Sequence, residues 1–149
     1  MARIRLQGVD ARYEDDLPLA LADVTLRCRN AYGSLVLVPL DDRPLAESRK
    51  VLVQAGTVAR PAGWIARARS VEAGDELHNG LQIMRKGGDP VLVENTKARI
   101  EIANTSLSKA TALDVNGLPM DVDVAVTRRD GRLHVTLPPN ALYTIVSED

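Results

Sequence analysis

The sequence predicts an all-β fold, an antiparallel β-sandwich of jelly-roll-like type with about 10 to 12 short strands. The first observation behind this prediction is an alternation of apolar and polar residues with a period of two, which is typical of strands that bury one face. The second is the recurrence of turn-forming residues about every 8 to 14 residues. The third is that no segment has the apolar spacing of an amphipathic helix.

Four segments alternate clearly, at residues 22–30, 97–103, 121–127 and 132–139. In each of them one side of the strand is apolar, so that side is expected to lie in the core. Residues 34–40 (SLVLVPL) are apolar on both sides, as expected of a covered central strand. In the four alternating segments, the residues predicted to face the core are Val24, Leu26, Cys28, Ala98, Ile100, Ile102, Val122, Val124, Val126, Leu133, Val135 and Leu137.

Glycine-containing pairs predict where the strands turn. Asp130-Gly131 lies between two alternating segments and predicts the clearest hairpin of the chain. The sequence has no internal repeat and no low-complexity linker, so residues 1–149 are predicted to form a single domain. Further turns are predicted at Tyr32-Gly33, Asn79-Gly80, Gly87-Gly88 and Asn116-Gly117.

The composition is that of an ordinary globular protein. Of the 149 residues, 45% are hydrophobic and 26% are charged, which permits one sizeable core and argues against disorder. The formal net charge is -1, so no overall positive field attracts nucleic acid or an anionic membrane surface. Neither nucleic acid nor a membrane is therefore expected as a partner.

The first residues show no signal peptide, and no run approaches the roughly 18 apolar residues of a membrane span. The chain opens almost directly on a strand pattern (ARIRLQG). This fits either a cytoplasmic protein or a domain of a larger secreted protein. We favour the second interpretation, which places the domain in the extracellular space or the periplasm, because a leader would be absent from such a domain.

Metal binding has limited support in the sequence. Cys28 is the only cysteine, which excludes an intrachain disulfide and a thiolate zinc site. His78 and His134 lack a spacing that would pair them as ligands. No EF-hand spacing is present, and a loop carboxylate is usually only solvated. The best candidates for a structural calcium ion are the loop carboxylates of Asp15, Asp16, Asp41 and Asp42.

The sequence assigns no catalytic residue. A glycosidase needs two carboxylates about 5 to 10 Å apart, and close pairs such as Asp121 and Asp123 are common in this chain. These two alternate with valines on the outward side of a predicted strand, so solubility and edge protection explain them better. No serine stands in a Gly-x-Ser-x-Gly elbow, and Cys28 lies on an inward strand side.

Sugar binding depends on exposed aromatic rings, on which the C–H faces of a pyranose stack. The chain has one Trp, three Tyr and no Phe. The candidate carbohydrate-binding residues are Trp64, Tyr32 and Tyr13, and both tyrosines stand near turn signals. For Trp64, alternation with Arg67 and Arg69 leaves two interpretations open, an exposed ring or a ring packed over small core residues.

Two parts of the chain have a pattern beyond simple alternation. The earlier stretch is residues 34–64, SLVLVPLDDRPLAESRKVLVQAGTVARPAGW, and the tail contains KATALDVNGLPMDVDV and VTLPPNALYTIV. Together they resemble the C-terminal non-catalytic β-sandwich accessory domain of planctomycete-type bacterial glycoside hydrolases. The resemblance runs from about Tyr32 to Val146, and Asp42 stands where that pattern usually has glycine. The matching positions of the earlier stretch are Leu40, Asp41, Pro44, Leu45, Ser48, Leu52, Val53, Gln54, Gly63 and Trp64.

The resemblance implies a non-catalytic domain that accompanies a polysaccharide-degrading enzyme. One alternative is a carbohydrate-binding module whose partner is a polysaccharide or oligosaccharide. Another is a structural domain that braces or docks a catalytic barrel in the parent chain, and its apolar patch would leave the isolated domain prone to form a homodimer. A small stand-alone glycoside hydrolase is the third alternative.

The resemblance also suggests what interrupts the apolar runs at residues 41–44 (DDRP). The interruption is expected to be a strand-to-strand connection and not a catalytic loop. Asp41 and Ser48 would then satisfy local backbone groups, while Leu45 packs under the sheet.

Overall fold

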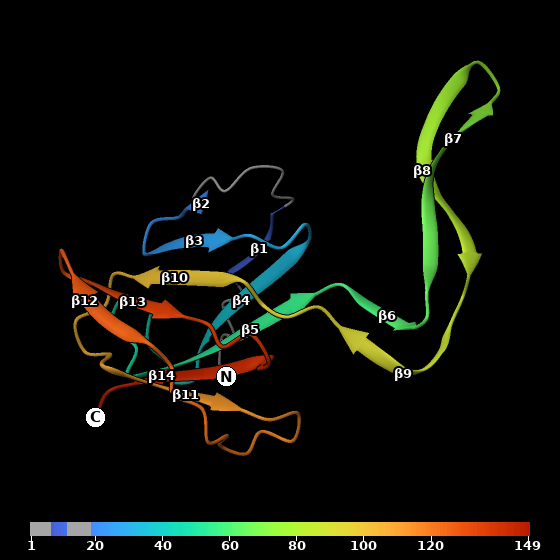
Figure 1. Ribbon diagram of the computed structural model, residues 1–149. Helices are drawn as coiled ribbons and strands as arrows, with labels where there is room; N and C mark the ends of the chain where they lie inside the picture. The colour runs from blue at the N-terminus through green and yellow to red at the C-terminus, as the bar shows by residue number, and fades with distance from the viewer. Residues whose placement is uncertain (1–6, 12–18) are drawn as a thin grey trace. The chain divides into compact units, whose positions relative to one another are not determined.

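The computed structural model describes residues 7–11 and 19–149 of the chain. These residues form fourteen β-strands, and none of them lies in an α-helix (Figure 1). The predicted all-β fold is therefore confirmed. Within this described part, no helix exists that is long and apolar enough to cross a membrane.

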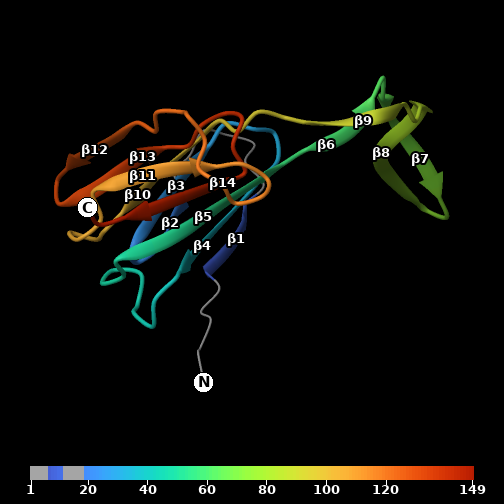
Figure 2. The ribbon, with the colours of Figure 1, turned by 90° about the horizontal axis from the view of Figure 1, so that it is seen from below.

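Ten of the strands form two five-stranded antiparallel sheets that share one apolar core, so this part of the chain is a β-sandwich (Figures 1 and 2). The first sheet has the order β1 (Gln7–Ala11), β4 (Gly33–Pro39), β5 (Lys50–Thr57), β14 (Tyr143–Ser147) and β11 (Lys109–Leu113). The second has the order β12 (Val126–Arg129), β13 (Arg132–Thr136), β10 (Ala98–Ile102), β3 (Val24–Cys28) and β2 (Leu19–Ala20).

The core of the sandwich is made of the inward side chains of both sheets. In the second sheet, Leu26 lies opposite Ile100 and Ile100 lies opposite Val135, and all three side chains are buried. Leu37 and Val53 form the corresponding row in the first sheet. In three of the four alternating segments the predicted inward residues are buried, which confirms the period-two reading there.

The fourth alternating segment differs from the prediction. Val122 and Val124 lie outside any strand and are only half-buried, and β12 begins at Val126. The segment follows β11 of the first sheet and leads to β12 of the second. It crosses between the sheets, and so it cannot pair with either one along its whole length.

The two strongest local predictions for the sandwich are confirmed in their positions. The predicted central strand is β4, which lies between β1 and β5; Leu35 and Leu37 are buried on its inner side, while Val36 and Val38 on the other side are half-buried and not fully covered. The hairpin at Asp130-Gly131 joins β12 to β13, and these two residues have φ values of 49° and 75°. A two-residue turn with positive φ at both positions is type I′, whose twist matches that of the strands.

Residues Val58–Glu94 form a second compact unit, which we call the arm; the first unit comprises Met1–Thr57 and Asn95–Asp149. The arm is one long hairpin in two parts. Its four strands explain why the strand number exceeds the expected 10 to 12. That residues 1–149 act as a single domain stays a prediction. The parts are β6 (Ala59–Ala62) with β9 (Gly88–Val93) and β7 (Ile65–Ala73) with β8 (Glu76–Arg85).

The turn of the arm is not at the predicted pair. Asn79-Gly80 lies inside β8, and the chain reverses at Gly74-Asp75, where Gly74 has a φ of 67°. Glycine at the first position of a two-residue turn suits type II′. The turn at Gly74-Asp75 pairs Ala68 with Leu81 on one face of the hairpin. A turn at Asn79-Gly80 would shift the register and lose this apolar pair.

Glycine is required where the two parts of the arm join. Gly87 has a φ of 71°, and a Cβ atom built on it would lie 2.8 Å from the backbone nitrogen of Trp64. Any side chain would therefore clash with backbone there, besides adopting an unfavourable φ. The side chain of Arg85 reinforces the same join, because its Nε donates a hydrogen bond of 2.7 Å to the carbonyl oxygen of Gly63.

A buried asparagine ties the loop before β5 to the loop after β10. Nδ2 of Asn104 donates hydrogen bonds of 2.8 Å to the carbonyl oxygens of Leu45 and Ser48. Its Oδ1 accepts the backbone N–H groups of Ser106 at 2.8 Å and Leu107 at 3.2 Å. The side chain is only 1% exposed, so four polar groups depend on it for their pairing.

Replacing Asn104 by alanine should lower the free energy of unfolding by about 2 to 3 kcal/mol, because it leaves buried carbonyl and N–H groups without partners. Urea unfolding of the variant measures this. Asn140, which is exposed, provides the control, and its alanine variant should change stability by less than about 0.5 kcal/mol. Equal losses for the two variants would contradict the assigned role.

Candidate functional site

The interruption at residues 41–44 is a structural connection, as predicted. Oδ2 of Asp41 accepts a hydrogen bond of 2.9 Å from the backbone N–H of Arg49. The Ser48 hydroxyl donates to the carbonyl oxygen of Lys50 at 2.9 Å, and Leu45 is buried in the core. Desolvation raises the pKa of Asp41, but the backbone hydrogen bond from Arg49 and the neighbouring polar groups of Ser48 and Arg43 outweigh it, so the pKa lies below its usual value.

A second motif aspartate has the same kind of role. In the tail of the resemblance, Oδ1 of Asp114 accepts the backbone N–H groups of Asn116 and Leu118, both at 2.8 Å. The N–H of Leu118 is the main cause that lowers the pKa of Asp114. The aspartate therefore closes a turn after β11, and it gathers backbone donors instead of facing a substrate pocket.

The calcium candidates divide between described and undescribed parts of the chain. Asp15 and Asp16 lie outside the described residues. Asp41 and Asp42 belong to the loop before β5, and no group of three or more His, Cys, Asp or Glu side chains that could hold a metal occurs among the described residues. Within the described residues, no third His, Cys, Asp or Glu side chain therefore joins this aspartate pair.

The aromatic candidates lie in different units. Tyr32 stands on the bend before β4, in the sandwich unit, and is 42% exposed. Trp64 is half-buried in the arm, with the guanidinium carbon of Arg60 at 5.2 Å from the ring centroid. A shallow hollow of about 370 Å³ adjoins this ring and is bordered also by Ile65 and Leu81. Tyr13 lies outside the described residues.

Of the two interpretations left open for Trp64, packing over small core residues is wrong. The ring lies in the hairpin arm and not in the sandwich core, and it precedes β7 instead of alternating within it. Alternation did identify the strand that follows, with Arg67 and Arg69 exposed on one side. Alternation does not show whether a core covers the other side of the strand.

The arm has two unlike faces, because residues directly opposite each other in an antiparallel pair share a face. One face carries Leu77, Leu81 and Ile83 of β8, and the polar pair of Ser70 and Asn79 separates Leu77 from the other two. On the other face Arg67 lies opposite Gln82, and the Arg67 Nε donates a hydrogen bond of 3.2 Å to the Gln82 Oε1. We call the first the apolar face; its paired rows are Ala66 with Ile83, Ala68 with Leu81, Ser70 with Asn79, and Glu72 with Leu77.

The apolar face is open to solvent in the described structure. Leu77 is 64% exposed, Leu81 is 59% exposed and Ile83 is 48% exposed. A group of exposed apolar side chains of this kind marks an interaction site or an aggregation hazard. Most exposed large apolar side chains of the described residues lie on the arm: Ile65, Val71, Leu77, Leu81, Ile83, Met84, Val91, Leu92 and Val93.

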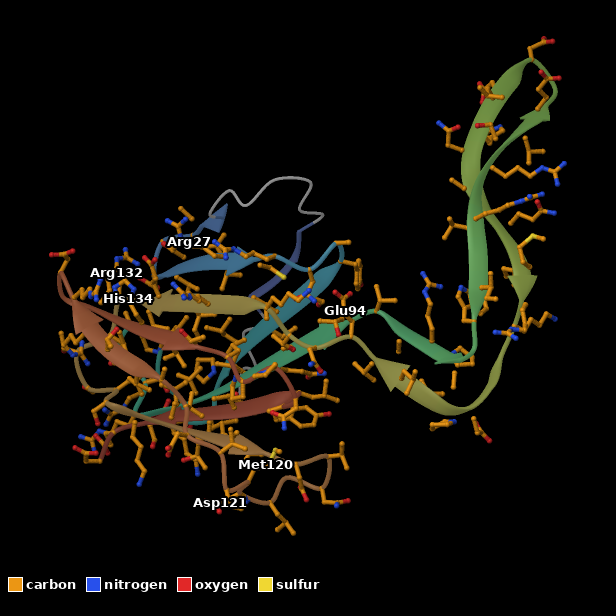
Figure 3. All side chains as sticks on the ribbon, in the orientation of Figure 1. Arg27, Glu94, Met120, Asp121, Arg132 and His134 are labelled. Carbon is orange, nitrogen blue, oxygen red and sulfur yellow. The ribbon has the colours of Figure 1, made fainter. Side chains whose placement is uncertain are left out.

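The sandwich unit carries a second candidate surface, of opposite character. A hollow of about 440 Å³ lies over the face of β3 and β10 that points away from the core. Arg27, which Figure 3 labels, borders it from β3, and Arg99 borders it from β10. No Asp or Glu is among the described residues that line it. The polar side chains of its wall are Arg27, Arg29, Thr96, Lys97, Arg99 and Thr136.

Sequence reasoning did not identify either surface as a site. The arm had a signal, because alternation on both sides of Gly74-Asp75 predicts a hairpin with one apolar face. No local sequence pattern indicates the cationic hollow, because the hollow depends on the register that places Arg27 opposite Arg99.

Comparison of the chain with protein-family models, with curated proteins and with solved structures found no match. The candidate surfaces are therefore interpreted from their own geometry and chemistry.

The role of Asp41 predicts a pH dependence of stability. Because its folded-state pKa is depressed, its contribution is present above the unfolded pKa of about 3.9 and is lost as the pH falls through the folded-state value. Replacing Asp41 by asparagine should cost about 1 kcal/mol at pH 7, a figure reduced for partial exposure. The cost should shrink as the pH falls below about 4.

Thermal unfolding of both proteins between neutral and acid pH tests this. The neighbouring exposed Asp42 offers a control, whose asparagine variant should differ from the parent by less than about 0.5 kcal/mol at either pH. A loss for the Asp41→Asn variant that stayed constant down to acid pH would show that the carboxylate charge is not the cause.

Proposed function

We propose that this chain is a non-catalytic accessory domain of a secreted polysaccharide-degrading enzyme, and that its arm docks onto the catalytic domain of the parent chain. The observation that carries the docking role is the exposed apolar face of β7 and β8. The enzymatic context comes from the resemblance of residues 32–146 to accessory domains of glycoside hydrolases. The docking role and the enzymatic context can be tested by separate measurements.

The apolar face needs a second layer. A two-stranded ribbon has no sheet behind it, and isolated hairpins are at best marginally stable in water. Burying Leu77, Leu81 and Ile83 against a partner would contribute roughly 1.5 to 3 kcal/mol for each side chain that becomes fully covered. Because the arm and the catalytic domain belong to one chain on this proposal, the association cost that opposes binding between separate proteins is reduced.

The aspartates of the matching segments support a non-catalytic role. Asp41 and Asp114 accept backbone N–H groups within their own loops. Both also have pKa values below the usual range, whereas a glycosidase acid needs a raised pKa. On this proposal the polysaccharide is cleaved elsewhere in the parent chain.

Carbohydrate binding is a second candidate function, and Trp64 is the observation that favours it. Its ring is half-buried, and the adjoining hollow of about 370 Å³ is within the size of small-ligand sites. Arg60 lies over the ring at 5.2 Å, so a sugar would have to stack beside that guanidinium or displace it. Loss of polysaccharide retention in a Trp64→Ala variant that still folds would support this function.

The docking role is tested by substituting the apolar face. A variant with Leu77→Thr, Leu81→Thr and Ile83→Thr places β-branched residues, which suit strands, in β8 but removes the apolar contacts. Titration calorimetry with the separately produced catalytic domain should show affinity at least tenfold weaker than for the unmodified chain, a loss of about 1.4 kcal/mol or more.

The opposite face of the same ribbon supplies the matched control. Val71 is 53% exposed and lies opposite His78, away from the apolar face. A Val71→Thr variant should bind the catalytic domain as the unmodified chain does. Equal affinity of all three proteins, or a parent chain without a catalytic domain, would refute the proposed function.

A further inference from the structure

The cationic hollow of the sandwich is built at an electrostatic cost. Arg27 of β3 and Arg99 of β10 are directly opposite each other in the register of the second sheet. Like charges at such positions destabilise a sheet, so the arrangement is unfavourable in the protein by itself. The next pair along the strands, Arg29 and Lys97, is also cationic. The two residues are neighbours, since the backbone N–H of Arg29 donates a hydrogen bond of 2.9 Å to the carbonyl oxygen of Lys97.

The carboxylate of Glu101 lies at the border of this array. Oε1 of Glu101 is 3.8 Å from Nε of Arg27 and 3.7 Å from Nδ1 of His134, so it is shared between two groups. Glu101 is two residues beyond Arg99 on β10 and does not line the hollow. Arg29 and Lys97 engage other groups of the chain as well, and the inference therefore depends on Arg27 and Arg99.

We propose that this hollow is a binding site for an anionic polysaccharide, one whose sugar units carry carboxylate or sulfate groups. Two guanidinium groups at the cross-strand positions would hold one such group, in the charge-assisted geometry that arginine favours. The hydroxyl groups of Thr96 and Thr136 border the same space and suit the sugar hydroxyls. Its volume of about 440 Å³ is within the range of ligand sites.

The choice of a polysaccharide over other polyanions rests on the proposed accessory function. The site is independent of the arm, since all its residues belong to the sandwich unit. Docking and anion binding can therefore fail separately. If the chain docks but binds no anion, only this inference fails, and if it binds an anion but does not dock, only the docking role fails.

The test is affinity electrophoresis of the 149-residue chain at low ionic strength in gels that contain polygalacturonate, dextran sulfate or neutral dextran. Retention is expected in polygalacturonate, dextran sulfate or both, and not in dextran. The polymer that retains the chain more strongly distinguishes a carboxylate site from a sulfate site. The Arg99→Gln variant should bind at least fivefold more weakly, since it removes one of the two opposed guanidinium groups.

Arg69 provides a charge-matched control, because it is exposed on the arm and outside the hollow. An Arg69→Gln variant should retain its affinity. The Arg99→Gln variant should also unfold at the same or a higher temperature than the unmodified chain, because a like-charge pair is relieved. A merely structural arginine would lower that temperature.

Three results would overturn the proposal. The first is no retention by either acidic polymer. The second is an equal loss of affinity for Arg99→Gln and Arg69→Gln, which would indicate diffuse charge attraction and no site. The third is equal or stronger retention in gels that contain poly-glutamate, which would indicate a site for an acidic protein segment.

Discussion

A two-stranded ribbon cannot cover its own faces, and the proposed role of the arm rests on this constraint. In the sandwich, each apolar side of a strand meets a second sheet, and the core residues are nearly inaccessible to water. In the arm the same alternation occurs with no second layer among its strands. Leu77, Leu81 and Ile83 are exposed to water. The proposed docking role rests on this uncovered face.

The sandwich unit supplies fixed geometry for the cationic hollow. Asn30 is 1% exposed, donates a hydrogen bond of 2.8 Å to the carbonyl oxygen of Asn95, and accepts one of 2.8 Å from the backbone N–H of Lys97. Asn95 is the first residue after the arm, and Lys97 borders the cationic hollow. One buried side chain thus positions the segment that leaves the arm and enters β10, where Arg99 follows two residues later.

The sandwich could be predicted from sequence because its signals are local. Alternation placed Leu26 and Ile100 in the core, and Asp130-Gly131 marked a hairpin, since each depends only on neighbouring residues. The role of the arm could not be predicted in this way, because alternation shows which side of a strand is apolar but not what covers it. The cationic hollow depends on the register between β3 and β10, which are distant in sequence.

Hydrogen–deuterium exchange of the arm tests the central claim most directly. Backbone amides of residues 65–85 would be compared in the isolated chain and in the full parent polypeptide, with the amides of β10 as an internal reference. The docking account predicts that the arm amides exchange at least tenfold more slowly in the parent polypeptide, while those of β10 exchange alike in both. Equal exchange of the arm amides in the two proteins would contradict it.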